Sequence, residues 1–203
     1  MKKKVLLVLS LLMIVTGCEK KLENRGIVVN KKTIEEEKIE KTEELLNYDS
    51  ILNDKKNKGF LLSTYSTISE VNFKNLFIEF PEEYSSLLNK ESIEYNNLIN
   101  LHPEFKDKDI YKLTSTSMKK YIKDKTGYGY EEFEKNGLSQ LVYMEAYDAY
   151  YTFLNYSDEL IDTYKYEING NFHYIWYKYN ENTYKVTLKE IDKKYYFNSN
   201  VIN

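Results

Sequence analysis

The sequence predicts an α+β fold in which N-terminal helices pack on a C-terminal four-stranded antiparallel meander. From residue 60 to about residue 153, apolar residues recur mainly at helical spacing. After Leu160 the pattern changes to an alternation with period two, which is typical of half-buried strands. The connections between the alternating segments are short, and short connections require antiparallel neighbours.

The first half of the folded region is expected to hold helices and one short strand. The segment 60–80 is rich in apolar residues. Pro81 then predicts a helix start, because proline needs no amide partner at the first helical position, and this helix should end before Pro103. A strand is expected over 109–113.

Two further helices are expected before the meander. The run Thr114–Ser117 offers several N-caps for a helix that Gly127 ends. The clearest helix is expected over 138–153, because five apolar residues of this segment fall within one narrow sector at 100° per residue. Its other side would carry Tyr143, Tyr147, Tyr150 and Tyr151.

The meander is expected to have four strands. Asn169-Gly170 is a hairpin turn signal, and 192–194 is a second turn. The strands would run over 164–168, 172–179, 184–188 and 195–197. Helices followed by an antiparallel sheet are also similar in order to the nuclear-transport-factor-2-like cone, which is the alternative fold; fold order carries no function.

The N-terminus has the layout of a secretory signal, with three lysines before an apolar run that is too short to span a bilayer. The sequence Val15-Thr16-Gly17-Cys18 resembles the lipobox of bacterial lipoproteins. The resemblance implies that residues 1–17 are removed and that the Cys18 sulfur takes a diacylglyceryl group. The alternative is an ordinary signal peptide with an incidental cysteine.

The expected domain organisation follows from charge and apolar content. Residues 1–17 are the lipoprotein signal peptide, and residues 18–58 are dominated by acidic and basic side chains, which indicates a solvated tether. The remaining residues, 59–203, suit a single α+β domain.

Composition excludes several classes of function. The net charge is −3, and loss of residues 1–17 would remove only basic side chains, so no nucleic-acid partner is expected. Cys18 is the only cysteine, which excludes disulfides and cysteine metal sites. His102 and His173 lack metal-ligand spacing, and no nucleotide-binding glycine loop is present, so neither a metal nor a cofactor is expected.

Two groups of residues are candidates for a site. Glu145 and Asp148 would lie one turn apart on the 138–153 helix, and a carboxyl buried among Tyr143, Tyr147 and Tyr151 would have the raised pKa of a general acid. The alternative is a solvated pair of carboxylates. An aromatic platform for a glycan or peptide is expected on one face of the 172–179 strand, and the other face must be core. The platform would consist either of Trp176 with Phe172 and Tyr174 or of Ile175, Tyr177 and Tyr179, unless a loop or the tether covers it. The lysines expected to flank it are Lys165, Lys185 and Lys189.

The segments 147–151 and 186–197 resemble pieces of uncharacterised lipoproteins of Gram-positive bacteria, a resemblance that implies no activity. The expectation is therefore an extracytoplasmic protein, lipid-anchored to the cell membrane at Cys18, that acts as a binding or structural module of the cell envelope. Its partners would be the membrane and an envelope glycan or protein. The alternative is an envelope hydrolase that uses Glu145 and Asp148.

Overall fold

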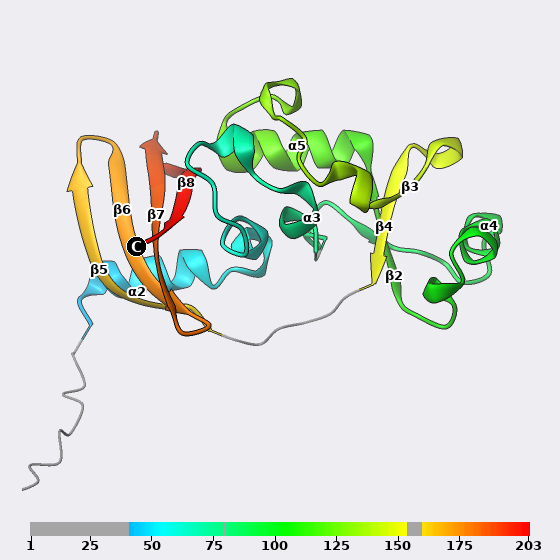
Figure 1. Cartoon of the computed structure of the whole chain (residues 1–203), viewed down its shortest axis with the longest axis horizontal. Coiled ribbons are helices and arrows are strands. Elements are labelled where there is room, and N and C mark those ends of the chain that lie inside the picture. The colour runs from blue at the N-terminus through cyan, green and yellow to red at the C-terminus, as the bar shows by residue number, and fades with distance from the viewer. Residues whose placement is uncertain (1–40, 79, 154–159) are drawn as a thin grey trace, which may run out of the picture. The chain divides into compact units, whose positions relative to one another are not determined.

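The computed structural model describes residues 41–78, 80–153 and 160–203. These residues form an α+β fold with two antiparallel four-stranded sheets, ordered β1-β2-β4-β3 and β5-β6-β7-β8 (Figure 1). The expected signal peptide, Cys18 and the first part of the expected tether lie outside them. Within the described ranges, no helix is long and apolar enough to cross a membrane.

The C-terminal meander is confirmed. Its hairpins follow one another in sequence, and Gly170, Asp192 and Lys193 adopt the positive φ angles that tight turns require. The strands are longer than expected at several ends: β5 (Asp162–Asn169), β6 (Phe172–Tyr179), β7 (Asn182–Ile191) and β8 (Lys194–Ile202). The alternative cone is not observed, because the strands divide between two sheets.

The expected tether is wrong for residues 41–58, which are folded. Helix α2 (Glu43–Leu52) begins at the N-cap Thr42 and buries Leu45, Tyr48 and Leu52. These three residues occupy positions i, i+3 and i+7, so a narrow apolar stripe lies within a highly charged segment. Because the stripe has only three residues, the many charged residues around it predicted a solvated tether and not a helix.

Helix α2 is fastened to strand β5 by polar groups. The Asp49 carboxylate accepts hydrogen bonds from the backbone N–H and the hydroxyl of Thr163, at 2.9 and 2.7 Å. The Asn53 side chain exchanges two hydrogen bonds with the backbone of Ile161, both 2.8 Å long. Helix α2 is therefore an integral part of the domain.

The segment between α2 and residue 80 supplies much of the core. It contains the 3-10 helices η1 (Lys55–Phe60) and η2 (Ile68–Glu70) and the short helix α3 (Phe73–Leu76). Phe60 stacks on Phe197 of β8 with ring centroids 4.6 Å apart. A Cβ on Gly59 would lie 2.0 Å from the Leu76 carbonyl oxygen, so only glycine permits this approach of two backbones.

The helix expected from Pro81 to Pro103 is wrong in its first half. The chain forms a turn, the short strand β1 (Ser86–Leu87) and only then α4 (Ile93–Leu101), which is followed by η3 (Pro103–Phe105). The Ser92 hydroxyl accepts from the Tyr95 N–H and fixes the start of α4. The expected strand and capped helix are confirmed as β2 (Ile110–Thr114) and α5 (Ser115–Thr126), with Thr114 and Gly127 as caps.

The helix expected over 138–153 is wrong. The segment forms η5 (Leu138–Gln140), β3 (Val142–Met144), η6 (Glu145–Tyr147) and β4 (Ala149–Phe153). Strand β4 lies between β2 and β3 and is apolar on both faces: Tyr150 belongs to the main core, whereas Ala149 and Tyr151 belong to a second apolar cluster with α4. A strand buried on both sides lacks the alternation that identifies strands, so its pattern imitated a helix.

Candidate functional site

The structure places the two candidate carboxylates on the turn between β3 and β4, where both are exposed. Asp148 has a φ of 44° and accepts hydrogen bonds from the Ser115 and Tyr143 hydroxyls, at 2.5 and 2.9 Å. These bonds, that from Ser115 above all, lower the pKa of Asp148. A general acid needs the opposite shift, so Asp148 serves to tie this turn to the start of α5.

The candidate tyrosines do not converge on that carboxylate as a group. Tyr143 contacts Asp148, but the Tyr151 hydroxyl donates to Glu94 of α4, and Asn97 of α4 donates to the Tyr147 hydroxyl at 2.8 Å. Burial, together with the bond to Glu94, raises the pKa of Tyr151. Tyr147, in the turn before β4, and Tyr151, on β4, thus contact α4. The two candidate carboxylates and the three candidate tyrosines do not form one pocket.

The two faces of β6 differ in burial. Ile175 and Tyr177 are completely buried in the main core, and His173 on the same face is also buried. The opposite face carries Phe172, Tyr174 and Trp176, each of which remains partly accessible. The sequence left open which face was core, and the structure assigns the Trp176 face to the outside of the sheet.

Lysines lie over the rings of this outer face. Trp176 pairs with Lys165 on β5 and Lys185 on β7, and their ammonium nitrogens lie 4.2 and 5.9 Å from its ring centroid. Lys189 lies 5.9 Å from the Phe172 centroid. These three lysines are the ones expected to flank the platform. We call this surface the lysine-aromatic face: Lys165, Phe172, Tyr174, Trp176, Lys185 and Lys189.

The lysine-aromatic face presents positive charge beside flat apolar rings. Each cation-π contact holds an ammonium group near the surface, where it remains able to bind an anion. Glu167 pairs with Lys165 at 2.8 Å and is the acidic neighbour of the face. This combination suits a ligand that has both a ring surface and acidic groups.

Each of the two histidines contacts other side chains of the fold. His102 is the C-cap of α4, and its ring lies near Glu104. His173 is buried, with Nδ1 2.7 Å from the Tyr48 hydroxyl of α2 and Nε2 2.9 Å from the Glu190 carboxylate. In the part of the chain that the structure describes, no group of three or more His, Cys, Asp and Glu residues is placed to hold a metal ion.

A cavity that the sequence did not indicate lies between η2, the segment 128–133 and β8. Its volume is about 230 Å³, and its lining includes Tyr128, Glu132 and Asn198. The lining comes from three segments far apart in the chain, so no local motif carried a signal for it.

No protein-family model matches the chain, and neither the curated proteins nor the solved structures contain a match. Function is therefore argued from the geometry of the sites alone.

Proposed function

We propose that the protein is a lipid-anchored, extracytoplasmic binding module of the cell envelope, and that the lysine-aromatic face holds an acidic glycan of that envelope. The observation that carries the proposal is the position of Trp176 between Lys165 and Lys185 on the outer face of the sheet.

The location rests on the lipobox resemblance. A thioether-linked diacylglyceryl group at Cys18 carries two acyl chains, and each buried methylene contributes about 0.8 kcal/mol. Two chains hold a protein stably at a bilayer, whereas one chain holds it only marginally. The anchor thus needs no membrane-spanning helix.

The ligand class follows from charge and shape complementarity. Three lysines surround the rings of one strand, and Glu167, which pairs with Lys165, offsets one of these charges, so the face carries a net positive charge on a chain whose overall charge is −3. Lysine binds carboxylates and phosphates as a point charge. Aromatic rings offer flat apolar surfaces against which the C–H faces of a sugar ring pack. A neutral glycan would use the rings but leave the lysines without a role.

The alternative hydrolase has weaker support. The lowered pKa of Asp148 and the exposure of both Glu145 and Asp148 favour a structural role for that turn. The geometry therefore does not support a proton donor at Glu145 or Asp148.

A binding experiment tests the proposed function. The full chain, purified in detergent with its lipid, is titrated against polygalacturonate as an acidic glycan and pullulan as a neutral one. We expect binding to polygalacturonate, and at least tenfold weaker binding, about 1.4 kcal/mol, for Trp176→Ala and for Lys165→Ala/Lys185→Ala. Salt should weaken the binding, because the lysines lie at the surface.

Lys106→Ala is the matched control, since Lys106 is exposed in a turn of the other half of the domain. Equal binding of pullulan, or unchanged binding by the two face variants, would contradict the proposal. In the same preparation, mass spectrometry should find the diacylglyceryl group on Cys18, and Cys18→Ser should leave the membrane fraction.

A further inference from the structure

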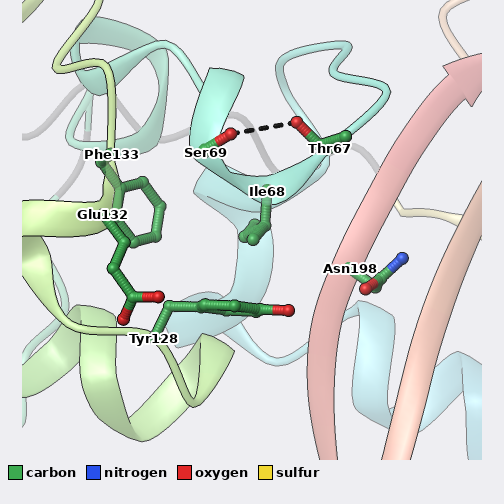
Figure 2. Close-up of a pocket in the computed structure, with 7 residues that line it drawn as sticks. All are labelled: Thr67, Ile68, Ser69, Tyr128, Glu132, Phe133 and Asn198. Atoms are coloured by element: carbon green, nitrogen blue, oxygen red, sulfur yellow. Dashed lines mark hydrogen bonds between the residues drawn. The ribbon is translucent and has the colours of Figure 1, made fainter.

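We propose that the cavity between η2, the segment 128–133 and β8 is a second binding site, which takes one uncharged sugar ring. Figure 2 shows the residues that line it, with the Tyr128 ring extending toward Asn198. This site is separate from the lysine-aromatic face and does not depend on the function proposed for that face.

The wall that carries Tyr128 is held in place by hydrogen bonds. Gly127 ends α5 in the left-handed region, with a φ of 77°. The Tyr128 N–H then donates to the Thr126 hydroxyl at 3.1 Å, and the Gly129 N–H donates to the Glu132 carboxylate at 2.6 Å. The Glu132 bond closes the 3-10 helix η4 (Tyr130–Glu132). The backbone at Tyr128 and the Glu132 carboxylate are thus held in place before any ligand arrives.

The opposite wall, η2, is tied to the first. The Glu134 N–H donates to the Ser69 carbonyl at 3.0 Å. The Thr67 and Ser69 hydroxyls lie 3.0 Å apart and bond to each other, as Figure 2 shows. The cavity therefore has fixed walls, which reduces the conformational entropy that binding would cost.

A β-bulge supplies the third side. Thr187 pairs with Ser199 and Leu188 pairs with Phe197, so Asn198 is an extra residue without a partner on β7. Bulges redirect side chains and are common beside binding sites. Here the bulge residue Asn198 is part of the cavity lining.

Polar groups at the cavity remain available for a ligand. Among the residues that the structure describes, neither the Asn198 amide nor the Tyr128 hydroxyl has a side-chain hydrogen bond, and one Glu132 oxygen is also unused. The apolar part is formed by Ile68 and Phe133, each 5 % exposed. A few oriented polar groups around an apolar floor are the usual composition of a small-molecule site.

Size and charge select the ligand class. The volume of about 230 Å³ is below the roughly 300–1,000 Å³ of sites for drug-sized molecules, so the cavity suits a single ring. The free groups include an amide, a phenol and a carboxylate oxygen, which can donate to and accept from sugar hydroxyls. Glu132 is the only charged residue among the described residues that line the cavity, so an acidic sugar would be repelled.

Ligand-detected NMR with the full chain tests this site, using glucose, N-acetylglucosamine and glucuronate as probes. We expect the two neutral sugars to bind in the millimolar range and glucuronate to bind at least fivefold more weakly. Tyr128→Ala and Asn198→Ala should each weaken the neutral sugars at least tenfold. Tyr128→Phe keeps the ring and should show a smaller loss, which keeps the test valid if the alanine variant fails to fold.

Asn96→Ala is the control for this site: Asn96 is exposed on α4, so this variant should leave binding of the neutral sugars unchanged. The proposal is overturned if neither neutral sugar binds, if glucuronate binds as well as glucose, or if the Asn198 and Tyr128 variants bind like the unaltered chain.

Discussion

At the scale of single residues, Asn200 joins segments that lie far apart in the chain. Its side chain is completely buried, donates to the Ser63 carbonyl at 2.9 Å and accepts from the Tyr177 hydroxyl at 3.0 Å. Its backbone N–H and carbonyl pair with those of Tyr65, at 2.9 and 2.7 Å. One amide thus connects the segment before η2 to the middle of the C-terminal sheet.

We predict that Asn200→Ala lowers the free energy of unfolding by about 2–4 kcal/mol, since the Ser63 carbonyl and the Tyr177 hydroxyl would be left buried without this partner. Urea unfolding followed by circular dichroism measures the change. Asn100→Ala, at an exposed position of α4, should stay within about 0.5 kcal/mol of the unaltered chain. A similar small change for Asn200→Ala would show that the connection is dispensable.

Asn200 also shows a limit of sequence analysis at this scale. The last strand was expected over 195–197, and the run Asn198–Asn200 that follows has low strand propensity. Strand β8 continues to Ile202 because Asn200 meets its hydrogen-bonding partners in other segments. Such partners are distant in the sequence, and no local pattern indicates them.

At the scale of elements, the predictable parts are those whose signals are local. The β5–β8 hairpins follow from alternation and turn residues, and α5 follows from its caps. Helix α2 and strand β4 form because they are buried against segments that are distant in the sequence, and both were predicted wrongly. The prediction of a helix over 138–153 also led to the candidate site, because Glu145 and Asp148 would share a helix face only if that helix existed.

We predict that a chain beginning at Lys41 folds and that a chain beginning at Gly59 does not. The second truncation removes Leu45, Tyr48 and Leu52 from the core and leaves the polar partners of Asp49 on β5 unsatisfied. Thermal unfolding and proton NMR dispersion of the two truncated chains provide the measurement. A cooperative transition in the shorter chain at the temperature of the longer one would contradict this role of α2.

At the scale of the whole molecule, the core depends on tyrosine to an unusual degree. The sequence has 21 tyrosines, and Tyr121 and Tyr177 are among its largest completely buried side chains. Burial raises the pKa of both well above the ordinary value, and it raises the pKa of Tyr48 to about 12. The core therefore requires its phenols to stay protonated.

We predict cooperative unfolding in alkali. Above the unfolded tyrosine pKa of about 10, the unfolded chain releases protons that the folded chain keeps, so stability is full below pH 10 and falls as the pH rises through the raised values. The phenolate absorbance at 295 nm that comes from the buried tyrosines should appear together with the loss of far-ultraviolet circular dichroism in this range. Ionisation of the buried tyrosines with the dichroism intact would contradict the prediction.

One further consequence concerns mechanical load. The Lys41 ammonium group lies 2.5 Å from carboxylate oxygens of both Asp49 and Asp162, so this residue, just before α2, is bound to α2 and to the start of β5. A pulling force on the chain ahead of Lys41 would therefore reach α2 through the backbone and the edge strand β5 through the Lys41–Asp162 ion pair. Resistance to such a pull would be set by the seam between α2 and β5, while the hairpins β6 to β8 would stay largely unloaded until that seam opened.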